Sequence, residues 1–302
     1  MRRFRLSFFV SLTSKSLFFM HFLLLAVILF SFNNVLWKKN IGKSSVEFLI
    51  SYRAIFTTIF SWVALFILLP EFSVTPTDYL KITAGSILGV IGLFSMLLFL
   101  KKSSLQWVGI YNLIGILITT FYIWVFEEVE VSSVFFGGAF ILFGFGWFIH
   151  SNSTNSFQLN MRQHLLLSLM TLSFSASSLI HWKNLTENVS PLVIISNQES
   201  IVLLTSLFLV FRYKNIPKLK TSLHQNFAPI FSMSLVLLAA FSCSLLGLKI
   251  TNPIVSGMIF LASPITTIVF SSLFFKEAIS KQNWLAISVI SIGAFLLHLE
   301  TN

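Results

Sequence analysis

The chain has 302 residues, of which 56% are hydrophobic and 10% are charged, and its formal net charge is +10. A soluble domain carries about 25% charged residues, so this composition excludes a water-facing surface over most of the molecule and predicts an all-α integral membrane protein. The basic residues lie between apolar runs, which favours phospholipid headgroups over nucleic acid as the anionic partner.

Ten apolar runs are long enough to cross about 30 Å of hydrocarbon as helices. The first run follows a basic N-terminus, as in a signal peptide, but Lys38 and Lys39 follow it instead of a small-residue cleavage site, so we interpret it as a retained span. Pro70 ends the second run because it cannot continue the helical hydrogen bonds. The predicted spans are residues 17–37, 47–69, 79–100, 105–126, 131–149, 164–182, 191–211, 227–248, 253–275 and 282–299.

A polar stretch separates the fifth span from the sixth. Ser151-Asn-Ser-Thr-Asn-Ser156 has no hydrophobic periodicity, which indicates a linker. We therefore predict a first repeat at 1–150, a linker at 151–162 and a second repeat at 163–302. Five is an odd number, so the halves start on opposite sides of the membrane. The prediction is two five-helix inverted repeats with a site at their interface, near the bilayer midplane.

Two charge signals disagree on the orientation of the protein in the membrane. Ten spans put both termini on one side, where the loops hold seven Lys and Arg residues against twelve on the opposite side. The positive-inside rule then favours termini outside, whereas the flanks of the first span favour the reverse.

Four short motifs stand in order along the spans. They are Phe32-Asn33-Asn34-Val35, Ser51-Tyr52-Arg53-Ala54, Glu128 after the fourth span, and Ala262-Ser263-Pro264 followed by Lys276-Glu277. Together they resemble the motifs of EamA-type transporters of the drug/metabolite transporter superfamily. The first motif lacks the family's Trp and Gly, Lys276 replaces a glycine, and Gly115 stands where the first-half proline would fall. The resemblance covers nearly the whole chain and implies a transporter with cytoplasmic termini, which we adopt.

Arg53 is a charged residue inside the second span. A charge at that depth costs roughly 2.5–3.5 kcal/mol on insertion scales, so the side chain should face protein or water. One interpretation is a cavity cation that attracts a substrate carboxylate, or a gate residue. The other is a structural group that caps carbonyls of a neighbouring helix.

Glu199 lies in the densest polar cluster inside any predicted span, with Asn197 and Gln198 beside it. The cluster falls near the position that corresponds to Arg53 in the other half. Glu199 could bind a substrate ammonium, carry a coupling proton or pair with Arg53; the alternative is a neutral acid bonded to adjacent helices. We predict Arg53, Asn197, Gln198 and Glu199 as substrate-binding residues.

Other polar residues in the spans have weaker assignments. Tyr111, Asn112 and Asn34 complete the predicted substrate-binding set, although such side chains also join helices in membranes. We expect structural roles for His181 and for the serines of the sixth span. Glu277 should fix its turn. Trp37, Trp107, Trp124, Trp182 and Trp284 are expected to anchor the spans at the membrane interface.

The sequence contains no zinc-protease pattern, phosphate-binding glycine loop or catalytic triad, so we predict no enzyme, metal or cofactor. We predict a secondary active transporter (permease) for a small organic metabolite, an amino acid or another zwitterion such as S-adenosylmethionine, working by alternating access. A coupling proton or counter-substrate is expected, in a monomer or homodimer of the bacterial inner membrane. The alternative is a membrane-embedded enzyme or a lipid-scrambling or scaffold protein.

Overall fold

The computed structural model describes residues 2–41, 45–69, 74–126, 134–153, 159–213, 227–250, 260, 262–277 and 280–299. Ten α-helices account for the regular structure of these ranges. They are α1 (Arg2–Ile41), α2 (Val46–Leu68), α3 (Pro76–Leu100), α4 (Leu105–Phe126), α5 (Val134–Ser153), α6 (Met161–Thr186), α7 (Pro191–Arg212), α9 (Phe227–Ile250), α11 (Ala262–Phe275) and α12 (Lys281–Leu299).

Local capping groups set several helix starts. The Thr75 side chain accepts a hydrogen bond from the Asp78 backbone before α3, and Pro76 occupies the first turn, where its missing N–H matters least. Asn160 and Gln163 form a reciprocal capping box at the start of α6. These caps lie outside the apolar runs, so α3 and α6 begin three residues earlier than predicted.

The multi-pass membrane prediction is confirmed. Seven helices are long and apolar enough to cross a membrane within the described residues. Large apolar side chains remain on their outer faces: Ile67 is 71% exposed, and Leu204 and Phe208 are each 67% exposed. Such surfaces suit lipid, because hydrocarbon contact exposes no apolar area to water.

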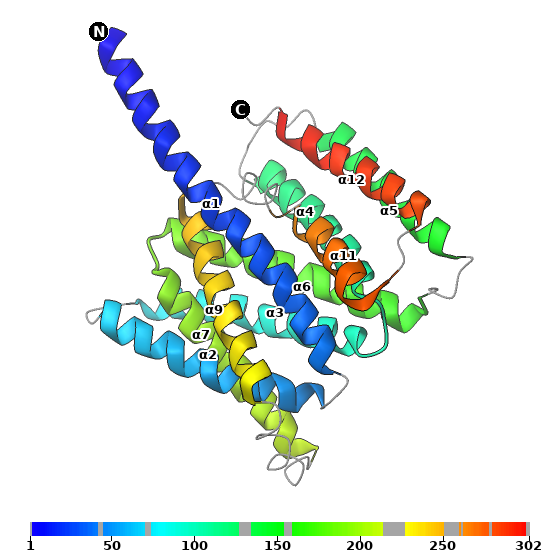
Figure 1. Ribbon diagram of the computed structural model, residues 1–302. Coiled ribbons are helices and arrows are strands. Elements are labelled where there is room, and N and C mark those ends of the chain that lie inside the picture. Colours follow the sequence, from blue (N-terminus) through cyan, green and yellow to red (C-terminus); the bar gives the residue numbers. More distant parts are fainter. Residues whose placement is uncertain are drawn as a thin grey trace.

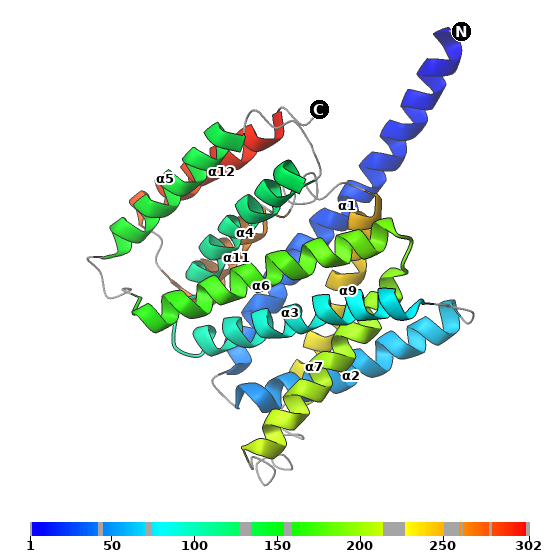
Figure 2. The same ribbon diagram turned by 180° about the vertical axis from the view of Figure 1, so that it is seen from behind.

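The helices pack mainly in pairs that join distant parts of the chain. The closest pairs are α3 with α6, α5 with α12, α1 with α9, and α2 with α7, and α4 lies against both α6 and α11. In both ribbon views α5 and α12 form an outer layer beside α4 and α11, while α2 and α7 lie at the opposite flank (Figures 1 and 2). Helices α1, α3, α6 and α9 lie between these flanks.

Glycines allow the closest of these approaches. A Cβ on Gly293 of α12 would lie 2.7 Å from the carbonyl oxygen of Gly137 in α5, and one on Gly144 of α5 would lie 3.0 Å from the carbonyl oxygen of Ala286 in α12. Small residues let membrane helices pack backbone to backbone, so these glycines explain the tight outer pair.

Several predicted boundaries differ from the structure. Ser151 and Ser153, placed in the linker, belong to the last turn of α5, because the polar run continues the helix past the apolar segment. The first span is part of a 40-residue helix that extends beyond both predicted ends. Residues 154–158, the acidic turn at 127–130 and the first part of the ninth span at 253–259 lie outside the described residues.

Candidate functional site

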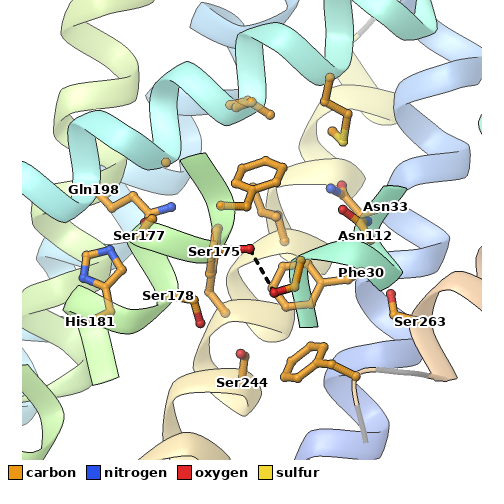
Figure 3. A pocket seen from close by; sticks show the side chains of 18 of the residues that line it. Phe30, Asn33, Asn112, Ser175, Ser177, Ser178, His181, Gln198, Ser244 and Ser263 are labelled. Atoms are coloured by element: carbon orange, nitrogen blue, oxygen red, sulfur yellow. Dashed lines mark hydrogen bonds between the residues drawn. The ribbon is translucent and has the colours of Figure 1, made fainter. Parts of the chain in front are cut away.

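A cavity of about 350 Å³ lies in the middle of the helix bundle. Residues of α1, α2, α3, α4, α6, α7, α9 and α11 line it, so it collects side chains from both ends of the sequence. Figure 3 shows polar side chains pointing into it from several helices, among them Ser175, Gln198 and Asn33. The pair α5 and α12 contributes none of the lining residues in the described part of the chain.

A buried ion pair forms part of the cavity wall. The Arg53 Nη1 atom of α2 lies 2.8 Å from the Glu199 Oε2 atom of α7, and the two side chains are 0% and 2% exposed. The hydroxyl of Thr57, one turn after Arg53, donates a hydrogen bond to the same carboxylate oxygen. Of the options left open by the sequence, the structure therefore has Glu199 paired with Arg53.

The guanidinium of Arg53 has N–H donors that are available for a ligand. Its Nε, Nη1 and Nη2 atoms make no aligned hydrogen bond to any described residue, so the 2.8 Å contact is an ion pair without good hydrogen-bond geometry. A guanidinium carries five N–H donors in a planar fork that matches a carboxylate. Arg53 can therefore accept an anionic ligand from the cavity.

Trp37 corrects one prediction from the sequence. Its ring lies beneath the guanidinium, with 5.7 Å from Arg53 Cζ to the ring centroid, and the residue is 1% exposed and lines the cavity. It is not an interfacial anchor, because α1 continues to Ile41 and carries Trp37 inside the bundle. A cation over an aromatic face is stabilised there, so Trp37 positions Arg53.

Three other predicted residues also line the cavity. Gln198 reaches it from α7, Asn34 from α1 and Asn112 from α4. The predicted set therefore converges from four helices once Arg53 and Glu199 are included.

Asn197 and Tyr111 lie elsewhere. Ser86 of α3 donates to Asn197 Oδ1 at 2.9 Å, and Asn197 Nδ2 donates to Thr83 Oγ1 at 3.3 Å. The Tyr111 hydroxyl is 2.6 Å from Nδ1 of His164 in α6. Neither residue is among those lining the cavity; Asn197 joins α7 to α3, and Tyr111 joins α4 to α6.

Two residues of the cavity wall were missed or underrated by the sequence analysis. Asn33 is 3% exposed and its Oδ1 has no hydrogen-bond partner among the described residues. His181, expected to be structural, is 5% exposed and lines the cavity. Helical spacing was the available signal, because Ser177, Ser178 and His181 are three and four residues apart and so share a face.

A polar cluster closes the end of the bundle where α1 and α11 terminate. Lys38 Nζ donates to the carbonyl oxygen of Leu100 at 3.0 Å and also to that of Ser103. Glu277 accepts hydrogen bonds from Ser104, at 2.7 Å, and from Ser271. Glu277 thus ties the end of α11 to the start of α4, which agrees with its predicted role at the turn.

The other end of the α3–α6 pair has an exposed charge cluster. Lys81 Nζ of α3 lies 2.6 Å from Glu187 Oε2 just after α6, and the two side chains are 41% and 47% exposed. Lys81 is also 3.6 Å from Asp78. This pair joins α3 to the end of α6 in contact with solvent, whereas the buried pair joins α2 to α7.

Comparison with known proteins agrees with this architecture. Residues 162–299 match the model of the EamA-like transporter family, which supports the resemblance over the second half of the chain. No curated protein matches the chain. One crystal structure of a protein aligns with 91% of this chain and 96% of its own, at a TM-score of 0.62 and 13% identity. That likeness concerns the fold alone, whereas the family match indicates a transporter rather than an enzyme.

Proposed function

We propose that this EamA-type membrane transporter of the drug/metabolite transporter superfamily is a secondary active transporter of small zwitterions, either an amino acid or a related metabolite such as S-adenosylmethionine. The observation that carries the proposal is the buried Arg53–Glu199 pair in the wall of the central cavity.

An ion pair of this kind suits a ligand that carries both charges. The substrate carboxylate binds the free N–H groups of Arg53, and the substrate ammonium binds Glu199. One buried ion pair is then exchanged for two, and no buried charge remains without a partner. A ligand with only a carboxylate would leave Glu199 uncompensated, and a buried charge without a partner is strongly unfavourable. The site therefore selects zwitterions over simple acids or amines.

The size and walls of the cavity limit the substrate further. A volume of about 350 Å³ lies near the lower end of the range for small-molecule sites, roughly 300–1,000 Å³. Phe30, Phe174, Phe241 and Phe260 supply apolar wall between the polar groups. These features favour a small metabolite with a compact body over a lipid or a polymer.

The packing supports two inverted five-helix repeats, one from α1 to α5 and one of α6, α7, α9, α11 and α12, which meet between Ser153 and Met161. When the two repeats are compared helix by helix, α1 corresponds to α6 and α3 to α9, and the α1–α9 contact matches the α6–α3 contact. The other corresponding helices contact each other directly, in the pairs α2–α7, α4–α11 and α5–α12. Arg53 and Glu199 lie on the counterpart helices α2 and α7. Rocking of one repeat against the other would open the cavity to each side in turn.

Glu199 is also the proposed carrier of a coupling proton. Protonation of its carboxyl would remove the charge that pairs with Arg53 and leave the guanidinium to bind an anionic counter-substrate, whereas the zwitterionic substrate requires the carboxylate. We place the protein in a bacterial inner membrane with cytoplasmic termini, as a monomer or homodimer. Periplasmic activity of a reporter enzyme fused at the C-terminus would contradict this orientation.

Uptake by proteoliposomes tests the proposal. The purified protein should take up radiolabelled amino acids saturably, and an imposed pH gradient should change the rate. Glu199→Gln should lower this uptake at least tenfold while the protein still elutes as a single species, whereas the matched control Glu187→Gln should leave it unchanged. Full uptake by Glu199→Gln, or no saturable uptake of any amino acid or of S-adenosylmethionine by the wild type, would overturn the proposal.

A further inference from the structure

We infer that His181, together with Gln198, forms a second polar subsite that binds a hydrogen-bonding group in the side chain of the substrate. The inference rests on the proposed function, because it assigns the far end of a zwitterion whose charged groups bind Arg53 and Glu199. It narrows the substrate class to zwitterions that carry an amide, hydroxyl or similar neutral polar group.

The imidazole of His181 is buried beside the Gln198 side chain, which interacts with it without forming an aligned hydrogen bond. The residue is 5% exposed, and neither Nδ1 nor Nε2 has an aligned hydrogen-bond partner among the described residues. A buried polar atom without a partner is destabilising, so native proteins pair nearly all of them. Because His181 lines the cavity, a ligand in the cavity can supply the missing partners.

The surroundings hold the imidazole at this position. A Cβ on Gly85 of α3 would lie 2.8 Å from His181 Cε1, so a side chain at this position would displace the ring. The hydroxyl of Ser177 donates to the Gly85 carbonyl oxygen at 2.8 Å, and its proton is therefore not available to the ring. The imidazole therefore packs against α3 at Gly85, at the wall of the cavity.

Gln198 completes the subsite. Its amide nitrogen would lie 3.4 Å from a Cβ on Gly89, one turn along α3 from Gly85, and Ser177 Oγ would lie 3.3 Å from the same Cβ. Figure 3 shows the side chains of Gln198, Ser177 and His181 grouped at one end of the cavity, away from Asn33, Asn112 and Ser263 at the other. Donors and acceptors from α6 and α7 therefore meet at this end.

The subsite adjoins the ion pair. Gln198 and Glu199 are consecutive residues of α7, so their Cα atoms are about 3.8 Å apart. Both residues line the cavity, as His181 does, so we expect one ligand to contact the ion pair and the subsite together.

The chemistry of the subsite explains its selectivity. A neutral imidazole has one N–H donor and one acceptor nitrogen, and the Gln198 amide has both kinds of group. An amide or hydroxyl in the substrate can pair with them, whereas an aliphatic side chain of the same shape would leave them unpaired. Sites built to hydrogen-bond a substrate group discriminate strongly against the analogue that lacks it.

The test compares uptake of two isosteric pairs of radiolabelled amino acids, asparagine with leucine and threonine with valine, by proteoliposomes. The wild type should take up the polar member of each pair about tenfold more efficiently. His181→Phe keeps a ring of similar size but has no nitrogens, and it should lower this ratio to about one while uptake of leucine and valine continues. His181→Asn, which keeps a donor and an acceptor, should retain most of the preference.

Continued leucine or valine uptake by His181→Phe also shows that the variant is folded. A wild type without preference for the polar members, or an unchanged preference in His181→Phe, would overturn the inference and leave the proposed function standing. An inactive His181→Phe variant that elutes as a single species would also overturn it, because the ring nitrogens would then be needed for every substrate. Uptake of none of the four amino acids by the wild type would also overturn the inference, and the proposed function would fall with it only if no other zwitterion were taken up.

Discussion

Two ion pairs join helices from different halves of this protein, and they differ mainly in their surroundings. Arg53 and Glu199 meet at 2.8 Å in the middle of the bundle, with side chains 0% and 2% exposed. Lys81 and Glu187 meet at 2.6 Å at one end, with side chains 41% and 47% exposed. The distances are nearly equal, so the comparison isolates the effect of burial.

The energetic consequence of breaking an ion pair depends on its burial. Water and salt screen an exposed pair, which then adds little to stability. A buried pair is no better for stability than well-packed apolar side chains of the same volume, yet breaking it leaves a charge without a partner. The central pair is therefore better explained by ligand binding than by folding, and each of the following variants probes that difference.

Removing one member of the central pair should have the largest effect. In Arg53→Ala, the Glu199 carboxylate keeps only the Thr57 hydroxyl as a partner, and breaking a buried pair costs about 3–5 kcal/mol. We expect a clearly lower melting temperature in detergent and complete loss of amino acid uptake. Unchanged melting and uptake would show that the pair has neither role.

Replacing both members should separate stability from function. Arg53→Met combined with Glu199→Leu leaves no buried charge, and such replacements are often neutral or stabilising. The melting temperature of the double variant should be close to that of the wild type and no lower than that of Arg53→Ala. The double variant should nevertheless take up no zwitterion. Retained uptake would place the binding site away from this pair.

The polar cluster at Glu277 should give an intermediate effect. Its carboxylate accepts hydrogen bonds from Ser104 and Ser271, and a hydrogen bond to a charged group contributes about 1.5–3 kcal/mol. Glu277→Ala should lower the melting temperature less than Arg53→Ala does. It should slow uptake without changing the preference for asparagine over leucine, because Glu277 does not line the cavity. A changed preference would mean that this end of the bundle shapes the site.

The exposed pair should give the smallest effect. Lys81→Ala removes a side chain that contacts Glu187 and Asp78 in solvent, and exposed ion pairs contribute little. Melting temperature and uptake should equal those of the wild type at 150 mM salt. If Lys81→Ala lowered the melting temperature and uptake as much as Arg53→Ala does, burial would not explain the difference between the two pairs.

The sequence predicted the existence of the spans better than the faces they present. Apolar runs identify membrane helices whichever way they turn, but a helix that is apolar all round gives no amphipathic signal for its rotation. Asn197, Gln198 and Glu199 were therefore grouped as one site. Consecutive helical residues point about 100° apart, and Asn197 faces α3 while the other two face the cavity.

Positions near helix ends were the other source of error. Trp37 was assigned to the membrane interface because the apolar run stops there, yet α1 continues to Ile41 and the ring lies under Arg53. His181 was judged structural for the same reason. Only tertiary packing, through the space that Gly85 leaves, brings its ring to the cavity. Charge within a span was the stronger signal: it singled out Arg53 and Glu199, and their pairing was one of the options that the sequence left open.

The most direct test of the central claim is competition for uptake of radiolabelled asparagine by wild-type proteoliposomes. The competitors are unlabelled asparagine, succinamate, which lacks the amino group, and 3-aminopropanamide, which lacks the carboxylate. If Arg53 and Glu199 each bind one charge of the substrate, asparagine should abolish the signal, and a tenfold higher concentration of either analogue should leave it nearly unchanged. Competition by succinamate or 3-aminopropanamide as strong as that by asparagine would contradict the account.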